Sequence, residues 1–77
     1  MTIRIGIVND VSFATRVIEK ALSPEPRFKV VWTATDGAMA VEHCKRDTPD
    51  IVLMDLVMPV MNGAEATRRI MRDSPCP

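Results

Sequence analysis

Short apolar runs alternate with amphipathic segments along the whole chain. Residues 3–8 (IRIGIV), 28–34 (FKVVWTA) and 51–54 (IVLM) are rich in β-branched side chains and too short for helices. This pattern predicts three strands. The third run is continuously apolar, as expected of a strand that is buried on both faces of a parallel sheet.

The segments that follow these runs carry apolar residues at spacings of three and four, which is typical of helices that bury one face. Ser12 is a suitable cap for the first helix, and Pro24 ends it. Pro49 closes the second helix, and Asn62 or Gly63 caps the third. The apolar positions of the first helix, which we expect to face inward, are Phe13, Ala14, Val17, Ile18, Ala21 and Leu22. The resulting βαβαβα order calls for an α/β fold with right-handed crossovers.

Two of the predicted strands end in acids. Asn9 and Asp10 follow the first strand, and Asp55 follows the third. Reactive groups of open parallel sheets gather outside the carboxyl ends of the strands, so these side chains share one pocket if the two strands are neighbours. Carboxylate oxygens suit Mg²⁺, and an aspartate beside such an ion can attack phosphorus. The alternative is that Asp55 only caps the following segment or ends the strand as a solvated charge.

Composition and charge narrow the range of possible functions. The 77 residues suffice for one small domain, with 47% hydrophobic and 26% charged residues and a net charge of zero. The balance of charges argues against nucleic acid and membrane surfaces as partners, and the absence of a signal peptide or apolar span favours the cytoplasm. Cys44 and Cys76 have no metal-ligand spacing, so we expect Cys44 in the core and His43 on the surface.

The segment that contains Asp55 carries a more specific signal. The string IVLM-Asp55-LVMPVMNG, preceded by Pro49-Asp50, resembles the phosphoacceptor segment of response-regulator receiver domains. The string IVND at residues 7–10 resembles the end of that family's first strand and the acidic residues that follow it. The string TDGAMA at residues 35–40 resembles the start of its second helix. The resemblance covers residues 1–77 and is closest in character to the receivers of chemotaxis-type protein-glutamate methylesterases.

The resemblance implies a flavodoxin-like, doubly wound parallel sheet of which residues 1–77 form the first three βα units, with strand order 2-1-3. It implies that Asp55 is the phosphoacceptor and takes its phosphoryl group from a sensor histidine kinase. Mg²⁺ would be bound by Asp10, Asp55 and the backbone carbonyl of Val57. Asn9 stands where the family usually has a second acid that acts through water, which implies weaker metal binding.

The same resemblance implies parts that residues 1–77 do not contain. Receiver domains continue through two further strands and helices, which supply a Ser or Thr and a Lys to the phosphorylation site. A fused or downstream effector, such as a methylesterase, would also lie elsewhere, so this chain is expected to be a phosphoacceptor module rather than an enzyme. We therefore expect little phosphorylation of the 77 residues alone.

The main alternative is a degenerate or truncated receiver that acts as an interaction module without phosphorylation. With strand order 2-1-3, the third strand would be an apolar edge, which favours homo-oligomers or exchanged elements. A nucleotide hydrolase is disfavoured because no G-x-x-x-x-G-K-[ST] loop is present. An Asp-x-Asp phosphatase is disfavoured because Val57 occupies the position of the second acid.

Overall fold

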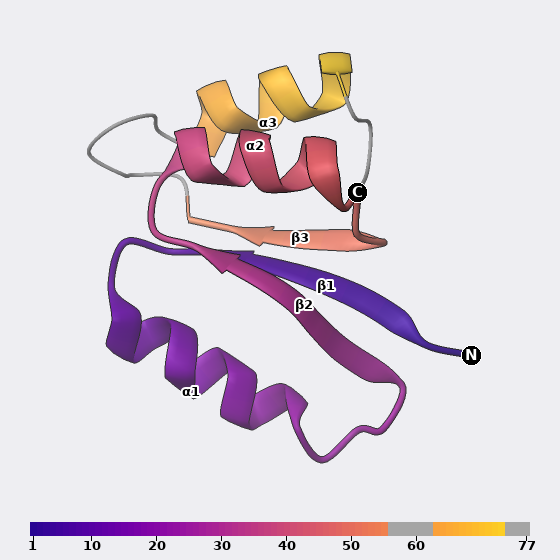
Figure 1. The fold of residues 1–77 in the computed structure, drawn as a ribbon. Helices are drawn as coiled ribbons and strands as arrows, with labels where there is room; N and C mark the ends of the chain where they lie inside the picture. Colours follow the sequence, from indigo (N-terminus) through magenta and orange to yellow (C-terminus); the bar gives the residue numbers. More distant parts are fainter. Residues whose placement is uncertain (56–62, 74–77) are drawn as a thin grey trace.

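The computed structural model describes residues 1–55 and 63–73 and has alternating strands and helices (Figure 1). The strand boundaries coincide with the three apolar runs of the sequence. The elements are β1 (Ile3–Val8), α1 (Ser12–Leu22), β2 (Phe28–Ala34), α2 (Gly37–Arg46), β3 (Ile51–Met54) and α3 (Gly63–Asp73).

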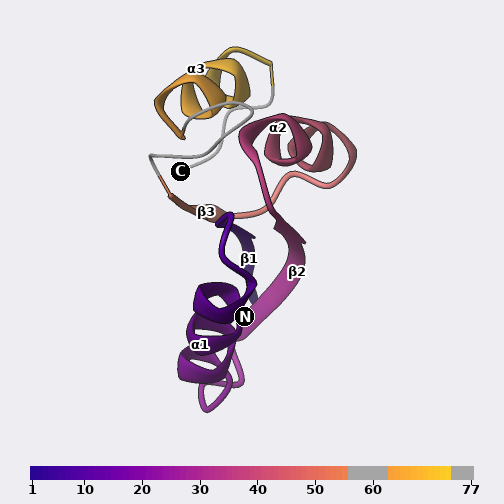
Figure 2. The ribbon, with the colours of Figure 1, turned by 90° about the vertical axis from the view of Figure 1, so that its left-hand side faces the viewer.

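The three strands form one parallel sheet in the order β2-β1-β3, as predicted. Ile5 pairs with Ile51 and Val8 with Met54, so β1 and β3 run side by side and end together. Figures 1 and 2 show α1 on one face of the sheet and α2 with α3 on the other. The central strand is therefore covered on both faces, and Ile5, Ile7 and Val8 are buried.

The main core lies between the sheet and the helices α2 and α3. Helical spacing places the small or branched side chains of α2 on one stripe, and Ala66 and Ile70 of α3 lie one turn apart. Cys44 is fully buried in this core, as the sequence predicted. The buried residues of the cluster are Val8, Trp32, Ala34, Ala40, Val41, Cys44, Ala66 and Ile70.

The apolar side of α1 is not buried as the sequence predicted. Phe13 is 74% exposed and Val17 51% exposed, and among residues 12–22 Thr15 alone is buried. Ile18 and Leu22 are half-buried. The periodicity identified an apolar face correctly, but the described sheet covers only the part of that face that contains Thr15, Ile18 and Leu22.

Three smaller expectations were also wrong. The strand β3 is half-buried rather than buried on both faces, because within residues 1–55 and 63–73 it pairs with β1 alone. Ser12 is the first residue of α1 rather than its cap, and the N-cap residue Val11 provides no side-chain hydrogen bond. His43 is half-buried rather than on the surface, because its ring stacks on Trp32 with the ring centroids 5.2 Å apart.

Candidate functional site

The carboxyl edge of the sheet brings the ends of all three strands together. The amide of Asp55 donates to the carbonyl of Val8 at 2.9 Å, which extends the β1–β3 pairing by one residue. On the other side of β1, the amide of Asn9 donates to the carbonyl of Ala34 at 3.0 Å. The segment that carries Asn9 and Asp10 is thus fixed against both neighbouring strands, and Asp55 begins directly beside it.

An open pocket of about 350 Å³ lies at this edge. Its polar side chains are Asn9 and Asp55, which the sequence had placed in one site. Asp55 is half-buried, whereas Asp10 is exposed and does not line the pocket. The remaining lining is apolar and comes from β1, β3 and α1, through Val8, Ile18, Leu53 and Met54.

The side chain of Asn9 already has a structural role. Its Oδ1 accepts a hydrogen bond from the amide of Val11 at 2.9 Å, which closes a turn between β1 and α1. An aspartate at this position could accept the same bond, because a carboxylate also presents an acceptor oxygen. The local fold therefore does not require the neutral amide, and the exchange of acid for amide affects mainly the charge of the site.

The donors at this edge fit a hard divalent cation. Asp55 provides a carboxylate oxygen and Asn9 an amide oxygen to the open pocket, and the pocket leaves space for the water ligands that Mg²⁺ usually keeps. The exposed carboxylate of Asp10 follows Asn9 just outside the pocket lining. Val57, whose carbonyl the sequence predicted as a ligand, and Asn62 lie outside the described residues. Among residues 1–55 and 63–73, no group of three or more His, Cys, Asp or Glu side chains is arranged to hold a metal.

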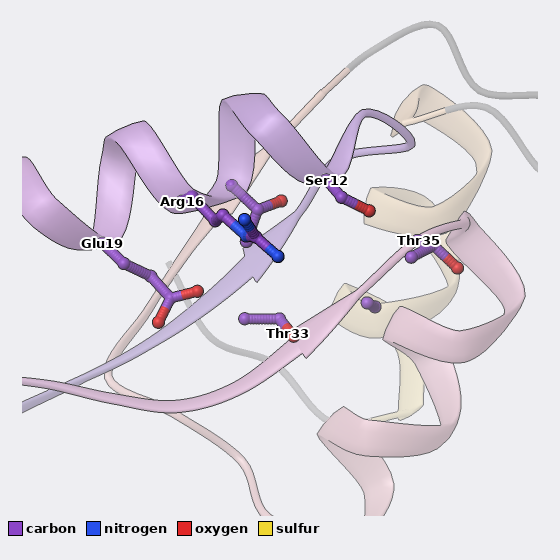
Figure 3. Close-up of a pocket in the computed structure, with 7 residues that line it drawn as sticks. Ser12, Arg16, Glu19, Thr33 and Thr35 are labelled. Atoms are coloured by element: carbon purple, nitrogen blue, oxygen red, sulfur yellow. The ribbon is translucent and has the colours of Figure 1, made fainter.

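A second groove lies between α1 and the end of β2 and was not predicted. Figure 3 shows Arg16 and Glu19 from α1 and Thr33 and Thr35 from the neighbouring strand end around it. Its volume is about 170 Å³. Arg16 and Glu19 are charged residues of α1 and are exposed. The spacing of Ser12, Thr15, Arg16 and Glu19 was the available signal, because these positions share one side of a helix.

Comparison with known proteins adds curated relatives of high identity. The chain is 60% identical over 73 residues to a protein-glutamate methylesterase/protein-glutamine glutaminase of Pseudomonas aeruginosa, covering 95% of this chain and 22% of that protein. A Pseudomonas fluorescens protein of the same name is 56% identical over 73 residues, with the same coverage. The chain thus spans about a fifth of the length of these relatives.

Solved structures show the same fold. The response regulator domain of Thermotoga maritima CheB matches with a TM-score of 0.96 and 38% identity, over 99% of this chain and 57% of that one. A chain from the CheX–CheY complex with BeF3 and Mg²⁺ of Borrelia burgdorferi matches with a TM-score of 0.85 and 32% identity, covering 91% of this chain and 53% of that one. These matches confirm the predicted flavodoxin-like receiver fold.

The family assignment rests on the sequence as well as on the fold. The pattern that defines the response regulator receiver domain matches residues 5–77. The matching family is thus a receiver domain rather than a catalytic domain, as the sequence predicted. No helix in the described part of the chain is long and apolar enough to cross a membrane. The chain belongs to the response regulator receiver domain family.

Proposed function

We propose that residues 1–77 form the first three βα units of a receiver domain in which Asp55 accepts a phosphoryl group from the phosphohistidine of a sensor kinase. The observation that carries this proposal is the position of Asp55, directly beyond β3 and bonded through its amide to the end of β1. A carboxylate oxygen of Asp55 forms the new bond to phosphorus, and the bond between phosphorus and the histidine nitrogen breaks.

The oxygen donors beside Asp55 support Mg²⁺ as the cofactor. Asp10 and Asp55 would bind it directly, the carbonyl of Val57 would supply a further oxygen, and Asn9 would act through water. When bound, the ion neutralises charge on the phosphoryl oxygens during transfer. Asp55 is half-buried, and the turn closed by the side chain of Asn9 holds that residue at the same edge of the sheet, which supports these two residues as part of the site.

The relatives suggest the output of this receiver. Because curated relatives that are 60% and 56% identical to this chain are protein-glutamate methylesterases, we infer that phosphorylation of Asp55 controls an effector of this class, fused or downstream, in the cytoplasm of a chemotaxis system. The zero net charge of the chain gives no support for nucleic acid or membrane surfaces as partners.

The proposal is tested with the full-length protein, a small phosphodonor such as acetyl phosphate, and Mg²⁺. We expect a base-labile phosphoryl adduct that requires Mg²⁺ and disappears in Asp55→Asn. Asp73→Asn is the matched control, because Asp73 is exposed and pairs with Arg72 at the far end of α3. An adduct that survives in Asp55→Asn, or none in the wild type, contradicts the assignment.

A second candidate is a module that acts through self-association without phosphorylation. Within the described residues β3 has β1 as its one neighbour, and Ile51–Met54 carries no charged residue of the kind that blocks pairing at sheet edges. The occupant would be a second copy whose β3 pairs antiparallel across a two-fold axis. Sedimentation tests it: a concentration-dependent dimer that Leu53→Lys dissociates supports this candidate, and a monomer at all concentrations excludes it.

A further inference from the structure

Arg4, near the start of β1, is hydrogen-bonded to three residues of the connection between α2 and β3. Its amide donates to Oδ2 of Asp50 at 2.8 Å, and the amide of Asp50 donates to the carbonyl of Arg4 at 2.8 Å. Its guanidinium donates to the carbonyl of Thr48 at 3.0 Å and to the carboxylate of Asp47. The segment from 47 to 50 is therefore attached to one residue through both backbone and side chain.

The side chains of β3 do not by themselves fix its register against β1. The four residues of β3 are all apolar, so the sequence alone does not distinguish one register from the next. A slip by one residue would shift Asp55 by about 3.3 Å along β1 and turn each side chain to the opposite face. In the observed register, Ile51 lies beside Ile5, and Asp55 reaches the carbonyl of Val8.

Each side-chain contact of Arg4 is too exposed to contribute much to the stability of the fold by itself. The side chains of Arg4 and Asp47 are 37% and 47% exposed, and isolated ion pairs of this kind contribute little to stability. Their combined effect is geometric, because the backbone and side-chain bonds are all satisfied only when Asp50 lies opposite Arg4. The contacts therefore select one register even where they add little to the overall stability.

We propose that Arg4 is a positioning residue for Asp55: its bonds to residues 47–50 set the register of β3 and thereby hold the acceptor carboxylate beside the end of β1. The register itself stands on the described contacts. Its consequence for phosphoryl transfer rests on the function proposed above. Arg4 lies at the opposite end of β1 from the site, so it acts through the strand and does not touch the reacting atoms.

Amide hydrogen exchange in the full-length protein separates this role from a general effect on stability. The amide of Asp55 reports the pairing of β1 with β3, and the amide of Asn9 reports the pairing of β1 with β2. For Arg4→Met we expect about tenfold faster exchange at Asp55 with little change at Asn9. Arg16→Met is the matched control, because Arg16 is exposed and forms no ion pair within the described residues.

A conservative pair of variants provides a second readout. Asp50→Asn keeps an oxygen that can accept from the amide of Arg4, so it should exchange like the wild type at Asp55, whereas Asp50→Ala should resemble Arg4→Met. Equal acceleration at Asp55 and Asn9, or no acceleration at either, overturns the proposal. The same variants are assayed with acetyl phosphate. If the wild type is not phosphorylated but the exchange pattern is as expected, the proposed function fails and the register assignment stands.

Discussion

The indole ring of Trp32 lies directly against Gly6. A Cβ atom at position 6 would be 2.5 Å from two carbons of the ring, and the pairing of β1 with β2 shifts its register at this point, between Ile5 and Gly6. The ring is held there by its Nε1, which donates to the carbonyl of Asp47 at 3.0 Å, and by the stacked ring of His43. Trp32 thus links the sheet to the end of α2.

This contact predicts that Gly6→Ala destabilises the protein. The added methyl group overlaps a rigid aromatic ring, so either Trp32 or the strand must move, and overpacking of this kind typically costs about 1–3 kcal/mol. Chemical denaturation followed by circular dichroism measures the change, and this signal does not depend on Trp32.

Pairing Gly6→Ala with Trp32→Leu tests the cause. In the Trp32→Leu background the added methyl group has space, so its cost should fall by about 1 kcal/mol or more. Equal costs in both backgrounds would mean that the ring is not what excludes a side chain at position 6.

The cap of α2 provides a second prediction. The side chain of Asp36 accepts a hydrogen bond from the amide of Met39 at 2.8 Å, so Asp36→Ala should lower the free energy of unfolding by about 1 kcal/mol. Ser12→Ala is the control and should have little effect, because Ser12 lies inside α1 and Val11 occupies the cap position. Thermal denaturation of both variants makes the comparison, and an equal loss in the two would contradict it.

Asn9 allows a prediction about the metal. Asn9→Asp adds a negative charge near the proposed ion, and for a divalent cation at the distance of one intervening water this should raise Mg²⁺ affinity roughly tenfold. The turn to Val11 should persist, because a carboxylate can accept the same bond. Chemical-shift titration with Mg²⁺ measures the affinity. Unchanged affinity would argue against an ion beside Asn9.

The loop between α1 and β2 predicts a pH effect at the opposite end of the sheet. The guanidinium and backbone amide of Arg27 bond to Glu25 and hold the pKa of its carboxyl below its usual value. A lowered pKa in the folded state means that the stabilisation is present above the unfolded pKa and is lost as the pH falls through the folded pKa. Glu25→Gln should therefore have a lower melting temperature than the wild type at neutral pH, and the two melting temperatures should converge in acid. A difference in melting temperature that widens in acid would mean that the pKa of Glu25 is raised in the folded state rather than lowered.

The strands and the position of the proposed acceptor Asp55 could be predicted from the sequence because their signals are local. The runs 3–8, 28–34 and 51–54 are dense in β-branched residues, and each became a strand with those boundaries. The order of the sheet followed from the βαβ pattern together with the family resemblance. Asp55 was identified by its position after an apolar run and by the loop motif that follows it.

Long-range contacts could not be predicted in the same way. Arg4 bonds to residues 43 to 46 positions away, and no pattern in the sequence joins it to Asp47 or Asp50. Periodicity showed that Phe13 and Val17 belong to an apolar side of α1, but it does not show which surface lies opposite them. His43 was placed on the surface because it is adjacent to Cys44, and adjacent residues of a helix do not face the same side. The flat ring of Trp32 instead gives it a stacking partner.

The most direct test of the central claim is to locate the phosphoryl group. The full-length protein is treated with acetyl phosphate and Mg²⁺, digested under conditions that preserve acyl phosphates, and sequenced by tandem mass spectrometry. We predict a single Mg²⁺-dependent phosphoryl group on Asp55, the residue whose amide bonds to Val8 at the end of the central strand. A phosphoryl group on Asp10, His43 or any other residue, with Asp55 unmodified, would contradict the account.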